Sequence, residues 1–243
     1  MFEVDAMPYR TLTIQEVARM LGTDVRRVQR MAQRGQIPCQ KVKGHYRFNR
    51  AEITEWLQRT VGAMDGEHLA GFDAGMTQQR QALRDDVVIT PLLRPAAVTT
   101  NLGSRTKDST LRELVALAEA TGLVLNGQDL LDAVLHREEL YSTAMEGGIA
   151  IPHPRRPLPY AIAEPILVVA RTTRGIAFGA PDGGLTDLFF LTVSQDDRHH
   201  LHVLARLCRM LYDPDFVVRL RQAETAPAMI ELMQDRELEV ISR

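Results

Sequence analysis

The sequence predicts an α/β protein with a small helical head at its N-terminus and a larger C-terminal domain, in which helices flank a mixed sheet. Residues 10–60 are basic and follow a helical pattern, and residues 61–86 carry four glycines with little periodicity. From Val87 onward, strand-like runs alternate with helical ones. We therefore expect domains at 10–60 and 87–238, joined by a linker at 61–86 that ends in a short helix over 77–83.

Length and composition limit the class of protein. A chain of 243 residues that is 45% hydrophobic can bury at least one core. No apolar run is long enough to span a membrane, and residues 1–10 lack a signal core, which predicts a cytoplasmic protein without membrane insertion. Cys39 and Cys208 are far apart, which argues against a structural zinc site. No metal or other cofactor is expected.

Charge is distributed unevenly along the chain. The net charge is −2, but residues 10–60 hold eleven Lys and Arg against four acids, which gives +7 there and −9 elsewhere. Such asymmetry indicates that the head binds a polyanion and that the larger C-terminal domain does not.

The sequence pattern of the head predicts two short helices, a hairpin and a third helix. Thr13 and Glu16 form a capping box for the first helix, and Gly22 begins the turn before the second. Gly35 ends the second helix, and the hairpin turns at Lys43-Gly44. Two short helices joined by so brief a turn form a helix-turn-helix.

This order of parts, in the runs LTIQEVARMLG, VRRVQRMAQRGQIP and GHYRFNRAEITEWL, resembles the excisionase and MerR-type winged helix-turn-helix family. A helix bearing several arginines fits the major groove of DNA, and a basic wing would grip phosphates or an adjacent minor groove. The predicted DNA contacts are Arg26, Arg27, Arg30, Lys41, Lys43 and Arg47. A solvated basic face and a protein-binding head are the alternatives. The sequence leaves the question of a homodimer open, because the long dimerisation helix that follows the wing in MerR-type regulators is not evident.

His153 is the candidate reactive residue of the larger domain. It stands between Pro152 and Pro154, directly after the apolar run Ile149–Ile151. Because both prolines restrict the backbone, we expect the imidazole to be displayed rather than packed. Histidine keeps an unprotonated nitrogen near neutral pH, which suits a nucleophile. A purely structural histidine is the alternative.

Other short motifs accompany His153: Arg137-Glu138, Ser142-Thr143, the run GIAIPH that ends at His153, the strand-like run 187–191 and His200-Leu201. Through these motifs residues 136–159, and more broadly residues 87–233, resemble the type-2 enzyme IIA domain of the bacterial phosphotransferase system, in its mannitol, fructose and nitrogen-regulatory branch. The resemblance implies that His153 accepts a phosphoryl group from a phosphocarrier protein. It further implies that Arg137 neutralises the phosphate, that Ser142 or Thr143 hydrogen-bonds it, and that His200 approaches as a second histidine. Phosphoryl transfer depends mainly on such positioning and charge compensation.

Several neighbouring residues have simpler readings. The cluster of His199, His200 and His202 also fits the solvated first turn of a helix. Alternatively, His199 and His202, three residues apart, could bind one metal ion. Asp196-Asp197 predicts a helix cap, and Arg155-Arg156 either dock an acidic partner or lie solvated.

The leading hypothesis is a transcriptional regulator whose DNA binding responds to phosphorylation of His153. One alternative is a phosphotransfer intermediate, the enzyme IIA component of a sugar or nitrogen-regulatory phosphotransferase system; another is a phosphorylation-dependent interaction module. In each case the domain forms a phosphohistidine rather than acting as a free-standing enzyme. The expected strands are 149–151, 166–171 and 188–193, and the expected helices are 110–121, 128–140, 199–211 and 226–234.

Overall fold

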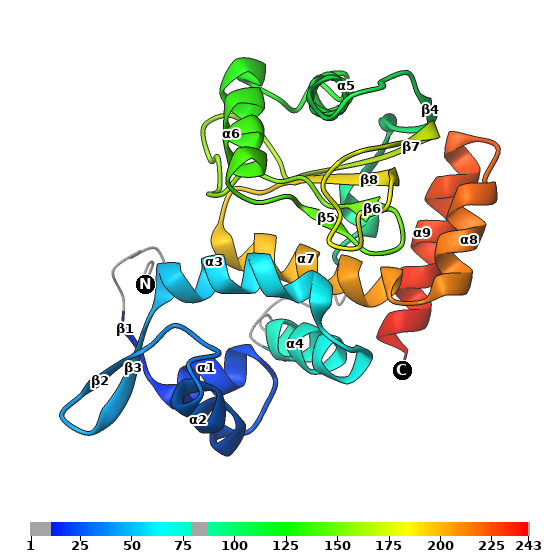
Figure 1. The fold of residues 1–243 in the computed structure, drawn as a ribbon. Coiled ribbons are helices and arrows are strands. Elements are labelled where there is room, and N and C mark those ends of the chain that lie inside the picture. The colour runs from blue at the N-terminus through cyan, green and yellow to red at the C-terminus, as the bar shows by residue number, and fades with distance from the viewer. Residues whose placement is uncertain (1–10, 79–86, 243) are drawn as a thin grey trace. The chain divides into compact units, whose positions relative to one another are not determined.

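The computed structural model describes residues 11–78 and 87–242, and the chain divides into two units, Met1–Arg84 and Asp85–Arg243 (Figure 1). Within the described residues, no helix is both long enough and apolar enough to cross a membrane.

The N-terminal unit is a helix-turn-helix with a hairpin wing. Three short strands form one antiparallel sheet in the order β1-β3-β2. The elements are β1 (Thr11–Leu12), α1 (Ile14–Met20), α2 (Val25–Gln33), β2 (Gln40–Val42), β3 (His45–Asn49), α3 (Arg50–Thr60), the 3-10 turn η1 (Val61–Ala63) and α4 (Gly66–Gln78). The expected order of two helices, hairpin and third helix is confirmed.

Local chemistry explains the boundaries of these elements. The Thr13 backbone N–H donates to the Glu16 carboxylate over 2.8 Å, and the Glu16 backbone N–H donates to the Thr13 hydroxyl, so the predicted capping box forms. The wing turns at Lys43-Gly44, where both residues have positive φ. Two consecutive residues of positive φ match the twist of a tight hairpin, which explains the glycine there.

The expected linker at 61–86 is wrong over most of its described part, because η1 and α4 occupy it. Gly71 and Gly75, taken as linker residues, let α4 approach the turn that follows α1. A Cβ on Gly75 would lie 2.7 Å from the carbonyl oxygen of Arg19, and one on Gly22 would overlap the backbone of Gly71. Leu69, Phe72 and Met76 form the buried stripe of this helix at three- and four-residue spacing. A fourth helix of 13 residues therefore follows α3. The short helix expected over 77–83 lies mostly outside the described residues.

The C-terminal unit is built on a five-stranded mixed sheet in the order β4-β7-β8-β6-β5. Strands β4–β7 and β6–β8 pair in parallel, whereas β7–β8 and β5–β6 pair antiparallel. The elements are the 3-10 turn η2 (Thr90–Leu92), β4 (Leu93–Leu102), α5 (Lys107–Glu119), α6 (Gly127–Leu140), β5 (Ala144–Met145), β6 (Ile149–Ala150), β7 (Ile166–Ile176), β8 (Thr186–Val193), α7 (Asp197–Leu211), α8 (Pro214–Gln222) and α9 (Ala226–Ile241).

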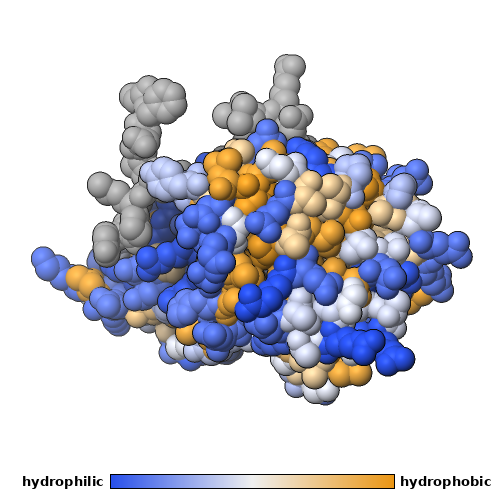
Figure 2. Space-filling view, turned by 90° about the horizontal axis from the view of Figure 1, so that it is seen from above, coloured by the Kyte–Doolittle hydropathy of each residue, from blue (hydrophilic) through white to orange (hydrophobic). Residues whose placement is uncertain are grey.

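Helices cover both faces of this sheet, as the predicted fold class requires. Helices α5 and α6 lie on one face and α7 on the other (Figure 1). The core beneath α5 and α6 joins Leu114 and Val134 to Phe189, Leu191 and Val193 of β8. Hydrophobic residues are also exposed among hydrophilic ones on the side seen in Figure 2.

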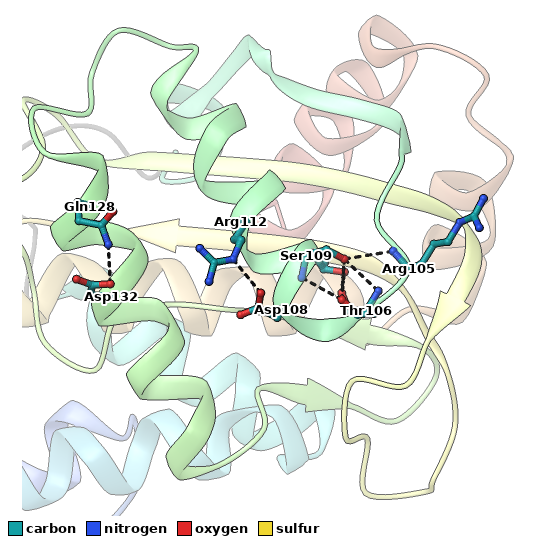
Figure 3. A network of polar contacts seen from close by, with 8 residues as sticks. Arg105, Thr106, Asp108, Ser109, Arg112, Gln128 and Asp132 are labelled. Carbon is teal, nitrogen blue, oxygen red and sulfur yellow. Dashed lines mark hydrogen bonds and ion pairs between the residues drawn. The ribbon is translucent and has the colours of Figure 1, made fainter.

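Side-chain caps fix where α5 begins. Thr106 and Ser109 form a reciprocal capping box, and Arg112 donates to Asp108 over 2.8 Å one turn later (Figure 3). On α6, Gln128 donates to Asp132 over 2.8 Å (Figure 3). The cap on α5 places Lys107 at the first helical position, from which its side chain reaches the site described below.

The expected strands and helices of this unit are confirmed, but β4, β5 and α8 were missed. Strand β4 lies at an edge of the sheet, contains Pro95 and pairs with β7 through register shifts, so its burial lacks a clean alternation. Helix α8 starts at Pro214 directly after Asp213, which caps it by accepting from the backbone N–H of Phe216.

A buried carboxylate fastens the first described residues of this unit to α9. The Glu237 side chain accepts from the backbone N–H groups of Val88, Ile89 and Thr90 over 2.6, 2.7 and 2.7 Å. Arg206 of α7 also donates to Glu237, over 3.3 Å, and both side chains are buried. The carboxylate thus ties together three segments that are distant in sequence.

Candidate active site

His153 lies directly after β6, in backbone that continues alongside β8. The Thr192 backbone N–H donates to the carbonyl of Pro152 over 3.0 Å, which extends the parallel pairing of β6 and β8. The side chain is only 3% exposed, so the expectation that the prolines display the imidazole is wrong. The prolines keep the backbone extended, and extension here carries the ring against α7 rather than out to solvent.

His153 and His200 come together, as the resemblance implied. Their ring centroids are 4.9 Å apart and the rings are inclined by 51°. His200 lies in the first turn of α7, which Asp196 caps by accepting from the backbone N–H of His199 over 2.8 Å. The predicted cap is therefore confirmed. His200 is also only 3% exposed, which excludes the reading of a solvated helix start for this ring.

The two ring nitrogens of His153 differ, because only Nδ1 has a hydrogen-bond partner within the described residues. Nδ1 lies 2.7 Å from the carbonyl oxygen of Ile151, and since a carbonyl only accepts, Nδ1 carries the proton. Nε2 then bears a lone pair, and it has no hydrogen-bond partner among residues 11–78 and 87–242. The buried Nε2 of His200 likewise has none in these two ranges.

Both rings are held neutral. Burial lowers the pKa of His153 well below 6.5, and repulsion from His200, when that ring is protonated, and from Arg137 lowers it further, against the opposing effect of the bond to Ile151. Burial also lowers the pKa of His200 to about 3, with His199 and Arg137 adding to the shift. At neutral pH the pair therefore offers unprotonated nitrogen rather than positive charge.

Arg137 supplies the positive charge at this site. It lies in the last turn of α6, is only 4% exposed, and donates to the carbonyl of Tyr141 over 2.8 Å. This bond satisfies a carbonyl beyond the helix end and restrains the guanidinium. Its charge acts on both histidines, because it depresses the pKa of each.

The hydroxyls of Ser142 and Thr143 are already used inside the protein. Thr143 donates its proton to Glu138 over 2.6 Å, and Ser142 donates to the carbonyl of Phe178 over 2.8 Å. A hydroxyl has a single proton to donate, so in this structure both side chains fix the loop that precedes β5. Their role as phosphate donors stays a prediction.

Glu138, Lys107 and Arg221 are supporting residues to which the sequence assigned no role. Buried Glu138 accepts from Lys107 Nζ over 2.9 Å and from the Thr143 backbone N–H over 3.0 Å. Arg221 of α8 donates to Asp187 and, over 2.6 Å, to the carbonyl of Gly147 in the turn before β6. Only Glu138 stood in a recognised motif; the other two come from distant segments that the fold brings together.

No group of three or more His, Cys, Asp or Glu side chains within the described ranges could hold a metal ion. His202, one of the two residues of the alternative metal site, is buried in α7.

In the N-terminal unit the predicted DNA contacts divide between α2 and the wing. Arg26 and Arg30 are exposed on α2, whereas Arg27 is half-buried and its charge helps to lower the pKa of Asp65, after hydrogen bonds from His68. Lys41, Lys43 and Arg47 are exposed on the wing, where Lys41 Nζ lies 5.9 Å from the ring centroid of Tyr46. The two sets thus present cations on both elements that the prediction requires.

Comparison with known families agrees with this geometry. A family model described as "Phosphoenolpyruvate-dependent sugar phosphotransferase system, EIIA 2" matches residues 91–236, more than half of the chain. The chain belongs to this family. A second model, for a helix-turn-helix domain, matches residues 11–61 and stops short of α4.

Relatives of the EIIA 2 domain are named either as nitrogen regulatory proteins or as components of phosphotransferase systems. A nitrogen regulatory protein of Bradyrhizobium diazoefficiens is 35% identical over 148 residues, covering 60% of this chain and 94% of that protein. The fructose-specific EIIABC component of Bacillus subtilis is 27% identical over 151 residues, covering 61% of this chain and 23% of that protein. The crystal structure of the nitrogen regulatory protein IIA-Ntr from Neisseria meningitidis has a TM-score of 0.56 at 23% identity, covering 60% of this chain and 99% of that one. The last similarity shows the fold of the EIIA 2 domain.

Proposed function

We propose that the protein is a DNA-binding transcriptional regulator whose activity responds to phosphorylation of His153 by carriers of the phosphotransferase system. The observation that carries this proposal is a neutral, buried His153 with an uncommitted Nε2, in a chain that also bears a helix-turn-helix unit.

The phosphoryl transfer uses His153 Nε2, the buried ring nitrogen that has no hydrogen-bond partner among the described residues. The lone pair of His153 Nε2 attacks the phosphorus held by a phosphocarrier protein, and a nitrogen–phosphorus bond forms. The bond from phosphorus to the carrier's leaving atom breaks, and its electron pair stays with the carrier. The Nδ1 proton remains on the ring, held by the Ile151 carbonyl, while Arg137 offsets the charge of the phosphoryl oxygens.

DNA binding belongs to α2 and the wing in this proposal. Arg26 and Arg30 are exposed one turn apart on α2 and would enter the major groove, where arginine bonds guanine through two donors. Lys41, Lys43 and Arg47 would meet phosphates beside it. Arg27, half-buried and close enough to affect Asp65, would contact the backbone rather than a base.

Phosphorylation would communicate with the head through charge. A phosphate adds about two negative charges. The head carries +7 over residues 10–60, so an added anion on the EIIA 2 domain could attract it and compete with DNA, or could change the assembly of the protein. The sign of the effect on DNA affinity is what the experiment below measures.

A second candidate is a phosphotransfer intermediate that passes the phosphoryl group to a sugar-specific partner. It is favoured by the names of relatives such as the fructose-specific component of Bacillus subtilis. The solved complex of the mannitol enzyme IIA with phosphorylated enzyme IIB from Escherichia coli shows that assembly for that protein. In this candidate the head would act only as an anchor.

The test combines phosphorylation with DNA binding. The full-length protein and His153→Gln would be incubated with phosphoenolpyruvate and phosphotransferase carriers, and the modified residue located by mass spectrometry. DNA selected from random sequence would then be titrated with each form. A phosphoryl group on His153 with a changed DNA affinity supports the regulator. Phosphorylation without any change in affinity, with label passing onward to a transport component, would replace it by the second candidate.

A further inference from the structure

Strand β8 carries two buried threonine hydroxyls. The side chains of Thr186 and Thr192 are fully buried, and neither hydroxyl has a hydrogen-bond partner among the described residues. An apolar site disfavours a hydroxyl that has no partner, and native proteins keep few of them. Valine has nearly the same shape without this cost, so what lies beside each hydroxyl decides whether it has a use.

Thr192 lies directly beside His153. Strands β6 and β8 pair in parallel, with Ile149 opposite Leu188 and Ala150 opposite Phe189. The bond from the Thr192 backbone N–H to the Pro152 carbonyl continues that register and sets Thr192 opposite His153. Their Cα atoms are therefore about 4.8 Å apart, the usual distance between neighbouring strands.

The two side chains also share one face of the sheet. Phe189, Leu191 and Val193 of β8 point into the core beneath α5 and α6. Since successive residues of a strand alternate, Thr192 points to the opposite face. That face carries His153 against His200 of α7. The Thr192 hydroxyl is thus buried on the side where the two imidazoles meet.

We propose that Thr192 is a further catalytic residue of this site, whose hydroxyl donates a hydrogen bond to the phosphoryl group carried on His153 Nε2. This inference rests on the function proposed above. The hydroxyl keeps its proton throughout and only stabilises charge on a phosphoryl oxygen.

The contrast with the loop hydroxyls supports this assignment. Ser142 and Thr143 would have to break bonds to Phe178 and Glu138 before donating to a phosphate. Thr192 has no such bond to break within the described residues. It is also held by a strand rather than by a loop, so its position is fixed before the phosphoryl group arrives.

Thr186 is a matched control on the same strand. It is equally buried and equally unpartnered, but it lies opposite Ile176 at the other end of β8. Thr192 lies six positions further along the strand, which is about 20 Å away. Removing either hydroxyl relieves the same kind of unpaired group, so both Thr→Val variants should keep or raise the Tm.

The experiment measures phosphorylation of His153 in the full-length parent, Thr192→Val, Thr192→Ser and Thr186→Val. Two donors are used: the carriers with phosphoenolpyruvate, and phosphoramidate, which needs no carrier. We expect Thr192→Val to be phosphorylated about 10- to 100-fold more slowly with both donors, the effect of one lost hydrogen bond to a charged group. Thr192→Ser, which keeps the hydroxyl, should retain most of the rate, and Thr186→Val should match the parent.

Each outcome decides between the inference and the function on which it rests. Slow phosphorylation of Thr192→Val with an undiminished Tm supports the inference, since a merely structural threonine would not separate rate from stability. Equal rates for Thr192→Val and the parent would overturn it while leaving the proposed function intact. A slowing confined to the carrier would place Thr192 in partner docking and also overturn it. A parent that neither donor phosphorylates would refute the proposed function itself.

Discussion

Replacing Glu237 should destabilise the C-terminal unit strongly, although the residue lies outside the site. Its carboxylate accepts three backbone N–H bonds and faces Arg206 over 3.3 Å, with both side chains buried. At an effective dielectric constant of 20, two unit charges at that distance attract by about 5 kcal/mol. Removing one partner of a buried pair costs about 3–5 kcal/mol in measured cases. The amide of Glu237→Gln keeps an acceptor, so we expect the lower end, about 3 kcal/mol.

Urea unfolding followed by far-UV circular dichroism measures this loss. With a slope of about 2 kcal/mol per molar, the midpoint of the C-terminal unit should fall by about 1.5 M. Glu239→Gln on the same helix is the control, because Glu239 is 43% exposed where it pairs with Arg236 and should cost under about 1 kcal/mol. Hydrogen exchange should also show loss of protection at Val88, Ile89 and Thr90. Equal midpoints for Glu237→Gln and the parent would refute this account of the buried carboxylate.

Three further predictions concern the histidine pair, α4 and the wing. His153 and His200 have lowered pKa values, so below pH 6.5 the unfolded chain binds more protons than the folded one. The free energy of unfolding should therefore fall from pH 6.5 toward 3, by up to about 1.4 kcal/mol per pH unit for each ring. The urea midpoints at pH 7 and pH 5 should differ less in His200→Gln than in the parent, and an equal difference in both would contradict the assignment. Gly75→Ala should destabilise the N-terminal unit by about 1–3 kcal/mol, since its Cβ would lie 2.7 Å from a backbone oxygen. Fluorescence of the single tryptophan, Trp56, follows the urea unfolding of this unit, and a midpoint equal to that of the parent would contradict the packing of α4. Lys43→Ala should weaken binding to all DNA sequences, and the dependence of log affinity on log salt concentration should become shallower by about one. Arg94→Ala in the C-terminal unit is the control and should leave both the affinity and this slope unchanged. Equal slopes for Lys43→Ala and the parent would contradict a contact between Lys43 and DNA.

Sequence reasoning was strongest where a local signal met a specific motif. The capping box of Thr13 and Glu16 and the turn at Lys43-Gly44 fix elements through neighbours in sequence, and both were predictable. The approach of His200 to His153 was implied by resemblance alone, because contacts between distant segments leave no periodic trace in a single sequence.

The errors have physical causes as well. Gly71 and Gly75 were taken as linker residues, but glycine also permits backbones to approach closely, and the apolar stripe of α4 was overlooked beside them. The prolines around His153 predict extension correctly, yet extension says nothing of which side α7 covers. The supporting bonds of Arg221 and Lys107 depend on the assembled sheet, so the sequence could not assign them.

The central claim is that phosphorylation of His153 changes how the protein binds DNA. The most direct test compares DNA affinity of the phosphorylated parent, the unphosphorylated parent and His153→Gln in one salt concentration, after mass spectrometry has located the phosphoryl group. The account predicts that His153 carries the group and that the affinity of the phosphorylated parent differs from that of the other two, which should agree. A phosphoryl group on another residue, or equal affinities for all three, would contradict it.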